Sequence, residues 1–338
     1  MSSKRHCKLL SVVLTLTVFL GILAGCTSNN QPSNSQPTKA TEPTKAAEPT
    51  KTDVVADAAN AYFANMGSDT YKIPEKDFVA KVKANEPMFI LDIRQADVYE
   101  KGHIKGAVNL PWGTAISDNL TKLPKDKPIM VYCYTGQTAG QTVALLNVAG
   151  FDAKSVNLGW DLGISKVEGV ADVTETTANP LTDITTEVNP EIKAAIDKYY
   201  KGLTEITDAR YKNYKISEDD AKKLVDDKDT SVIFLSVRKA EDYANGHIEG
   251  AVNIPFAKGM QQKFNTLPKD KKIIVYCYTG QTAGQTVAIL RLLGYDAVSL
   301  NAGMGMPSNA PAGWLNKGYP VVKSEEQKPV ESNDKDNS

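Results

Sequence analysis

The stretch Val131-Tyr132-Cys133-Tyr134-Thr135-Gly136-Gln137-Thr138-Ala139-Gly140-Gln141-Thr142-Val143-Ala144 decides the fold. It recurs without change at residues 275–288, so the offset between the two cysteines is 277 − 133 = 144 residues. A repeat of this length is a duplicated domain, because solenoid units have periods of about 20–50 residues. The chain therefore supplies its own internal comparison.

Each copy of this segment predicts a strand, a tight loop and a helix. Ile129-Met130-Val131-Tyr132 is a short apolar run, which is typical of a buried parallel strand. Residues 134–138 form a loop with one glycine, and apolar residues then recur at helical spacing. Gly150 and Gly294 stand where the two helices are expected to end.

Other parts of the two copies match as well, among them Gly102-His103-Ile104 and Gly246-His247-Ile248. Alternating strands and helices predict an α/β fold with two domains, each a mainly parallel sheet flanked by helices. The predicted boundaries are a signal peptide at 1–25, a tether at 26–54, domain 1 at 55–175, a linker at 176–190, domain 2 at 191–323 and a charged tail at 324–338.

The amino terminus carries a targeting signal. Lys4, Arg5 and Lys8 precede a short apolar run, and Leu23-Ala24-Gly25-Cys26 follows it. The run is short for a membrane-spanning helix and is typical of a secretory signal. The last four residues resemble the lipobox of bacterial lipoproteins, which implies cleavage before Cys26 and a lipid on that cysteine; a plain signal peptide is the alternative. We therefore expect a protein anchored by lipid to the bacterial cell membrane, facing the extracytoplasmic side.

Charge and cysteine content narrow the functional classes. Removal of residues 1–25 leaves 39 − 3 = 36 basic residues against 40 acidic ones, without a basic stripe, so a nucleic-acid partner is not expected. Cys133 and Cys277 are the cysteines left for chemistry in the mature chain. A disulfide between them would require the two sites to face each other, and their matching places in two repeats favour separate roles.

The position of each cysteine favours a nucleophile. It follows a buried strand, at the edge where reacting groups gather in open α/β sheets. The loop can point several backbone N–H groups at one centre, and the start of the helix adds partial positive charge. Both effects favour the thiolate. We expect Thr138 and Thr282 to cap the helices with their hydroxyls. A buried structural cysteine is the alternative.

Three motifs, each present twice, carry a resemblance to a known family. They are Leu91-Asp92-Ile93-Arg94, Gly102-His103-Ile104 with Gly106-Ala107-Val108-Asn109, and the loop that begins at Cys133. With the ending Gly313-Trp314-Leu315-Asn316-Lys317-Gly318-Tyr319-Pro320-Val321, the chain resembles a tandem rhodanese over almost its whole mature length.

The resemblance implies a sulfurtransferase. Cys133 and Cys277 would take sulfane sulfur from a small donor such as thiosulfate, form persulfides and pass the sulfur to a thiol or cyanide, without a cofactor or metal. The loop residues would bind substrate and stabilise the anionic persulfide; they are Tyr134, Thr135, Gly136, Gln137, Thr138, Tyr278, Thr279, Gly280, Gln281 and Thr282. Neither loop contains the Lys or Arg that thiosulfate-using members often place there, which leaves the donor open.

Asp92, Arg94 and Arg238 are expected to support the two sites. We predict that Arg94 pairs with Asp97 and that Arg238 pairs with Glu241, each at the start of the next helix, in an architectural role.

Histidine and tryptophan have lesser expected roles. His103 and His247 are expected to be structural, and one Cys and one His per repeat are too few for a zinc site. Trp160 is expected to line its pocket, with Met304 in the equivalent place of the second copy.

Two other functional classes stay open. One is a non-catalytic rhodanese-like module that binds an anion or a partner at the cell surface. The other is a cysteine phosphatase or arsenate reductase, which needs an Arg that closes the loop. Ala139 and Ala283 stand at that position, which argues against this class.

Overall fold

The computed structural model describes residues 53–324. The predicted signal peptide, the lipidation site Cys26, the tether up to residue 52 and the tail from residue 325 lie outside the described residues. Between residues 53 and 324, no helix has the length and apolar character needed to span a membrane.

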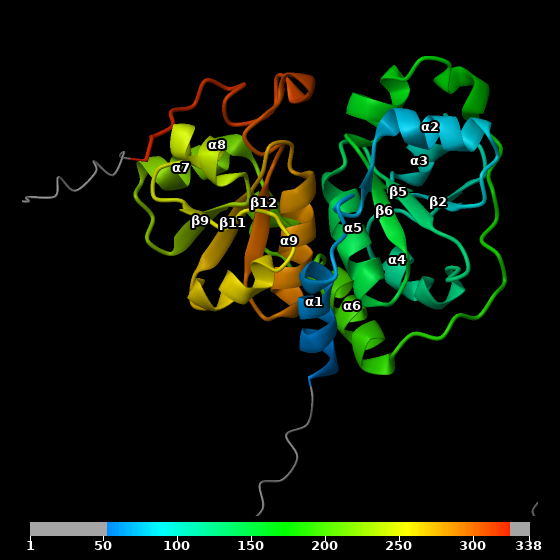
Figure 1. The fold of residues 1–338 in the computed structure, drawn as a ribbon, viewed down its shortest axis with the longest axis horizontal. Coiled ribbons are helices and arrows are strands. Elements are labelled where there is room, and N and C mark those ends of the chain that lie inside the picture. Colours follow the sequence, from blue (N-terminus) through cyan, green and yellow to red (C-terminus); the bar gives the residue numbers. More distant parts are fainter. Residues whose placement is uncertain (1–52, 325–338) are drawn as a thin grey trace, which may run out of the picture. The chain divides into compact units, whose positions relative to one another are not determined.

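The first half of the described chain alternates helices and strands (Figure 1). Its main elements are α1 (Val54–Ala64), β1 (Lys72–Ile73), α2 (Glu75–Lys83), β2 (Phe89–Asp92), α3 (Ala96–Tyr99), β3 (His103–Ile104), β4 (Ala107–Asn109), α4 (Thr114–Asp118), β5 (Ile129–Tyr132), α5 (Gln137–Val148), β6 (Ala153–Val156) and β7 (Thr174–Glu175). Five strands form a parallel sheet in the order β1-β6-β5-β2-β4, and β3 pairs with β7 in a small antiparallel sheet.

The second half repeats this architecture. Its main elements are α6 (Pro190–Gly202), β8 (Lys215–Ile216), α7 (Glu218–Asp226), β9 (Val232–Ser236), α8 (Ala240–Asn245), β10 (Val252–Asn253), η6 (Met260–Thr266), β11 (Lys272–Tyr276), α9 (Gln281–Leu292) and β12 (Ala297–Leu300). The strands form a parallel sheet in the order β10-β9-β11-β12-β8. The predicted α/β class with mainly parallel sheets is confirmed.

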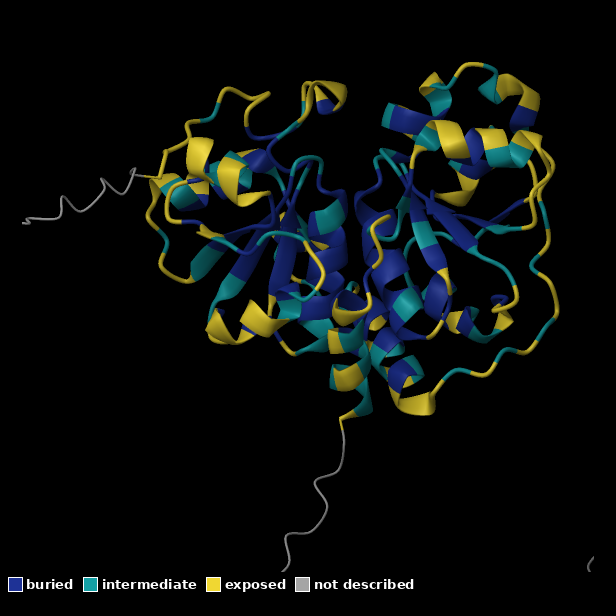
Figure 2. Cartoon of the chain, in the orientation of Figure 1, coloured by how far each residue is buried: buried dark blue, intermediate teal, exposed yellow. Residues whose placement is uncertain are grey.

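The central strands are covered on both faces, which explains their apolar sequences (Figure 2). In β5, Ile129 and Val131 belong to the larger hydrophobic core, which continues into the second domain. Met130 and Tyr132 point to a smaller core on the opposite face of the first sheet. Successive strand residues point to opposite faces, so one short run supplies both cores.

The cysteine-bearing helices begin slightly earlier than predicted. Gly136 is the N-cap of α5 and Gly280 is the N-cap of α9, and neither helix has a side-chain cap. The expected capping by Thr138 and Thr282 is therefore wrong, because both threonines lie inside the first helical turn. The predicted helix ends are confirmed by the left-handed glycines Gly150 and Gly294, which have φ angles of 85° and 83°.

Helices α5 and α9 cross where their backbones come close together. A Cβ added to Gly140 would lie 2.3 Å from the carbonyl oxygen of Gln281, and one added to Gly284 would lie 2.3 Å from that of Gln137. Only glycine permits this separation, because a Cβ atom requires ordinary contact distances of 3.4–4 Å. The described residues of both domains belong to one compact unit, in which α5 and α9 make the most extensive contact between two elements.

The first helix of each domain also contacts the other domain. In α1, Phe63 packs edge-to-face on Phe256 and Phe264, and its carbonyl accepts a hydrogen bond from Gly259. In α6, the Tyr200 hydroxyl lies 3.3 Å from Thr142 Oγ1 of the first domain. Helices α1 and α6 therefore bind the two domains together.

The tyrosine one residue earlier in each helix makes a reciprocal bond. Tyr62 of α1 donates to Gln285 Oε1 at 2.7 Å, and Tyr199 of α6 donates to Gln141 Oε1. Gln141 and Gln285 belong to the repeated segment and are fully buried. The repeated sequence therefore builds a reciprocal interface as well as two loops.

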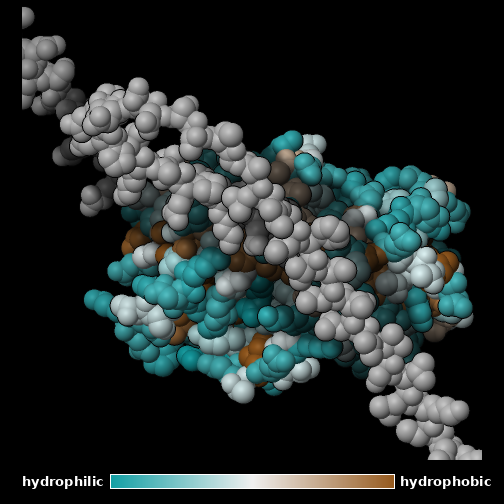
Figure 3. Space-filling view, turned by 90° about the horizontal axis from the view of Figure 1, so that it is seen from below, coloured by the Kyte–Doolittle hydropathy of each residue, from teal (hydrophilic) through white to brown (hydrophobic). Residues whose placement is uncertain are grey.

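The surface seen from below is mostly hydrophilic, with small hydrophobic groups between the polar ones (Figure 3). Among the described residues, the exposed large hydrophobic side chains are Val252, Met306, Leu315, Val321 and Val322. Met306 lines a cavity beside Cys277. The other four are single exposed side chains, which are common on protein surfaces and do not indicate a binding site.

Candidate active site

The two cysteines occupy equivalent places at the carboxyl ends of β5 and β11. Both side chains are buried, and neither forms a disulfide. The backbone N–H of Gly136 donates to Cys133 Sγ at 3.1 Å, and that of Ala139 donates at 3.4 Å. Gly280 donates the equivalent bond to Cys277 Sγ at 3.1 Å. These N–H groups stabilise negative charge on sulfur, because charged acceptors form stronger hydrogen bonds than neutral ones.

A second glycine closes the loop around Cys133 from the side of β6. A Cβ on Gly159 would lie 2.5 Å from the Cys133 carbonyl oxygen and within 2.8 Å of the loop nitrogens of Thr135 and Gly136. The N–H of Trp160 donates to the Cys133 carbonyl at 2.8 Å. This contact joins the cysteine loop to the segment that follows β6.

The second copy uses Gly303 in the same way, and a Cβ there would lie 2.4 Å from the Cys277 carbonyl oxygen. Sequence reasoning missed both glycines. The repeat could have indicated them, because Asn157-Leu158-Gly159 and Asn301-Ala302-Gly303 occupy matching places in the two copies.

A cavity of about 750 Å³ opens beside Cys277. Second-domain residues form one side of it, among them Phe256 and Met306. The first domain supplies the rest, with Lys72, Leu158 and others. The sequence did not indicate that one domain completes the pocket of the other.

The predicted loop residues divide between this cavity and the domain interface. Tyr278, Thr279 and Thr282 line the Cys277 cavity. In the first copy, Thr135 is half-buried and Thr138 is buried.

The loop tyrosines contact an earlier helix of their own domain, α3 for Tyr134 and α8 for Tyr278. The Tyr134 hydroxyl accepts a hydrogen bond from the Gln95 N–H at 3.1 Å, and that of Tyr278 accepts one from Lys239 at 3.2 Å. Tyr278 also donates to Asp242. These contacts hold the ring at the edge of each loop.

The side chains of Gln137 and Gln281 reach into the opposite domain. Gln137 Nε2 donates to Ser299 Oγ at 2.7 Å, and Gln281 Nε2 donates to Ser155 Oγ at 2.7 Å. Gln281 Oε1 also accepts a bond from the Leu158 N–H at 3.4 Å. Each amide thus ties the start of a cysteine helix to the last central strand of the other domain.

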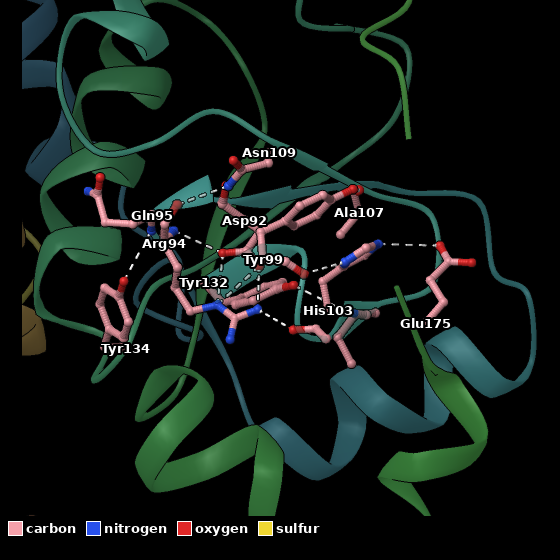
Figure 4. A network of polar contacts seen from close by, with 12 residues as sticks. Asp92, Arg94, Gln95, Tyr99, His103, Ala107, Asn109, Tyr132, Tyr134 and Glu175 are labelled. Atoms are coloured by element: carbon pink, nitrogen blue, oxygen red, sulfur yellow. Dashed lines mark hydrogen bonds and ion pairs between the residues drawn. The ribbon is translucent and has the colours of Figure 1, made fainter. Parts of the chain in front are cut away.

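Asp92 and Arg94 form a buried ion pair at the end of β2 (Figure 4). Arg94 Nη2 lies 2.6 Å from Asp92 Oδ2 and donates to the Gly102 carbonyl at 2.8 Å. Burial alone would lower the pKa of Arg94, but the hydrogen bonds and charge of Asp92 raise it. The predicted pairing with Asp97 is wrong, because the carboxylate two residues before Arg94 reaches its guanidinium directly, whereas Asp97 pairs with Lys101.

Trp160 packs against the same guanidinium, whose carbon lies 4.2 Å from the ring centroid. The tryptophan thus covers Arg94, and its indole stacks on Tyr132.

The second copy lacks this ion pair. Ser236 replaces the aspartate, and Arg238 donates to the Gly246 carbonyl. Arg238 Nε has no hydrogen-bond partner among the described residues. The predicted pairing of Arg238 with Glu241 is wrong, because the buried Arg238 bonds the Gly246 carbonyl, while the exposed Glu241 lies beside Lys239.

His103 and His247 hold their turns together, as predicted. The His103 ring stacks on Tyr99 at a centroid separation of 3.6 Å, and its Nδ1 lies 2.8 Å from the Tyr99 carbonyl oxygen (Figure 4). His247 repeats both contacts with Tyr243. Neither ring lines the cavity beside Cys277.

Comparison with known proteins agrees with this architecture. Residues 75–164 and 217–305 match the model of the rhodanese-like domain, and together they are more than half of the chain. The chain belongs to the rhodanese-like domain family, as a tandem of two such domains.

Curated relatives match single domains or parts of the chain. Over 72 residues the chain is 39% identical to the Escherichia coli protein called thiosulfate sulfurtransferase PspE, covering 21% of this chain and 67% of that one. It is 35% identical over 74 residues to thiosulfate sulfurtransferase GlpE of Pseudomonas savastanoi, covering 22% and 69%. It is 26% identical over 172 residues to a tRNA sulfurtransferase of Desulfurococcus amylolyticus, covering 48% of this chain but only 34% of that one. A Bacillus subtilis relative is likewise covered over only 44% of its length.

Proposed function

We propose that the protein is a sulfurtransferase in which Cys133 and Cys277 each carry sulfane sulfur as a persulfide. The observation that carries the proposal is a buried cysteine at a strand end whose sulfur accepts backbone N–H hydrogen bonds, present in both domains. Family membership and the names of the relatives support the same chemistry.

The reaction proceeds in two transfers. The cysteine thiolate attacks the outer sulfur of a donor such as thiosulfate, a new S–S bond forms, and sulfite leaves with the electron pair of the broken S–S bond. A thiolate or cyanide acceptor then attacks the terminal sulfur of the persulfide and restores the cysteine thiolate. Gly136 and Gly280 N–H groups stabilise the anionic sulfur in both transfers.

Intact-mass spectrometry tests the proposal. The protein is incubated with thiosulfate, a polysulfide or an organic persulfide, without acceptor. We expect a gain of one sulfur atom in Cys133→Ser and in Cys277→Ser, two in the wild type and none in the double variant. Addition of cyanide should remove the gained mass. An unchanged mass with every donor would contradict sulfur transfer and favour a non-catalytic binding module.

We also propose that a lipid on Cys26 anchors the protein to the extracytoplasmic face of the bacterial cell membrane. The support is the sequence of the amino terminus, which lies outside the described residues. Cys26→Ser should move the protein from the membrane fraction to the soluble fraction. Unchanged membrane association of this variant would contradict the proposal.

A further inference from the structure

We propose that each domain supplies the lysine that binds the donor anion at the other domain's cysteine. Lys72 of the first domain serves Cys277, and Lys215 of the second domain serves Cys133. The ligand is an anionic sulfane-sulfur donor of the thiosulfate class, so this inference rests on the proposed function. It provides the positive charge that both cysteine loops lack.

The Cys277 pocket shows this arrangement directly. Lys72 and Cys277 line the same cavity of about 750 Å³, although they belong to different domains. The Lys72 ammonium makes no hydrogen bond or ion pair with any residue between 53 and 324, although the side chain is half-buried. Burial lowers the pKa of Lys72, and the charge of Cys277 acts on it in the opposite direction. An ammonium without a partner beside a nucleophilic sulfur is suited to hold an incoming anion.

The path from Lys72 to Cys277 runs through a short chain of contacts. Lys72 of β1 is in register with Ser155 of β6. The Ser155 hydroxyl accepts the bond from Gln281, which is the first residue of the helix after the Cys277 loop. Strand β1 is therefore placed beside the opposite cysteine loop by the same amide that joins the two domains.

Lys215 repeats this chain in the other direction. It is in register with Ser299 of β12, and the Ser299 hydroxyl accepts the bond from Gln137 at the start of the Cys133 helix. The Lys215 ammonium also makes no hydrogen bond or ion pair within the described range. Burial lowers the pKa of Lys215, with opposing effects from the charges of Cys133 and Glu218. Lys72 and Lys215 are thus half-buried lysines at equivalent places in the two domains, with the same role in binding the donor anion.

The other charged groups of the Cys277 cavity differ from Lys72. Asp242 accepts a hydrogen bond from Tyr278, and the mostly exposed Lys239 lies 3.9 Å from Glu241. Glu75 also lines the cavity. Its carboxylate would repel an anion and makes no such hydrogen bond within the described residues. Lys72 is therefore the cation that the cavity offers beside the sulfur.

Variants with a single reactive cysteine test which lysine serves which cysteine. Cys133→Ser leaves Cys277, and Cys277→Ser leaves Cys133. Lys72→Met and Lys215→Met are each introduced into both of these variants. Single-turnover loading is followed by mass spectrometry over a range of thiosulfate concentrations. Lys72→Met should raise the half-saturating thiosulfate concentration for Cys277 by about tenfold or more, as expected for loss of a charged hydrogen bond, and leave Cys133 unchanged. Lys215→Met should do the converse.

Three controls define the result. Loading from a neutral organic trisulfide should not change, Lys72→Arg should retain most thiosulfate loading, and Lys76→Met, at an exposed lysine nearby, should have no effect. Equal slowing of both cysteines, equal slowing with the neutral donor, or no slowing would overturn the inference.

Sulfite binding separates this inference from the proposed function. Titration calorimetry with sulfite requires no sulfur transfer. If the wild type loads no sulfur, the proposed function fails, but weaker sulfite binding in Lys72→Met or Lys215→Met would still support the lysine sites. Unchanged sulfite binding in both variants would overturn them.

Discussion

Replacement of Gly140 by alanine should destabilise the protein, although the same change stabilises an ordinary helix interior by about 1 kcal/mol. The new Cβ would lie 2.3 Å from the Gln281 carbonyl oxygen, and ordinary contact begins at 3.4 Å, so α5 and α9 must separate by about 3.4 − 2.3 = 1.1 Å. That movement would lengthen the 2.7 Å bonds of Gln137 to Ser299 and of Gln281 to Ser155 toward 3.8 Å, beyond hydrogen-bonding distance.

The expected magnitude combines these effects. Overpacking costs about 1–3 kcal/mol and each lost hydrogen bond about 1 kcal/mol, against the gain of about 1 kcal/mol in helix propensity, so the net loss should be about 2–4 kcal/mol. Urea denaturation followed by circular dichroism measures the free energy of unfolding. Gly284→Ala should behave alike. Gly67→Ala, where the nearest atom is a side-chain oxygen at 3.4 Å, serves as the control. A Gly140→Ala variant as stable as the wild type would refute the close crossing.

Three further predictions concern buried and partly buried charges, and denaturation curves test each of them. Asp92→Asn should cost about 3–5 kcal/mol because Arg94 keeps an unpaired buried charge, and a loss below about 1 kcal/mol would contradict this. Ser236→Asp should stabilise the protein by about 1–3 kcal/mol by giving Arg238 Nε a partner; lower stability would argue against it. The pKa of Glu175 is lowered, chiefly by a hydrogen bond from a side-chain amide, so its stabilisation is present above the unfolded pKa of about 4.3 and is lost as pH falls through the folded pKa. Glu175→Gln should therefore be less stable than the wild type at neutral pH, with a difference that shrinks below about pH 4; a constant difference would contradict this.

Local features of the fold could be predicted because they follow from neighbouring residues. The apolar run before Cys133 and the glycine at 150 predict a strand and a helix end through backbone and burial preferences alone. The start of the helix was placed too late because Gly136, in a left-handed conformation, ends the loop where Thr138 had suggested a cap. A hydroxyl is a common capping group, but the loop geometry decided in favour of glycine.

The parts of the site that depend on the other domain could not be predicted in this way. Gln137 lies in the cysteine loop motif and suggests a substrate contact, but its amide bonds Ser299, which lies 162 residues away in sequence. Lys72 and Lys215 look like ordinary surface lysines at the start of short strands. Their position beside a cysteine depends on how two domains pack, and local periodicity carries no information about that packing.

The interface also explains why some residues are identical in the two copies. In the repeated segment, Gln137, Gly140 and Gln141 each contact the opposite domain, and so do their counterparts in the second copy. A change at one of these positions would disturb the packing of the helix after its own cysteine. It would also disturb the strand that carries the lysine proposed to serve the other cysteine. Positions that contact only their own domain have no such double role, and some of them differ between the copies, as Asp92 and Ser236 show. The two cysteine sites are therefore coupled through the interface. Gly140→Ala should impair sulfur loading of both Cys133 and Cys277, whereas Lys72→Met should affect only Cys277.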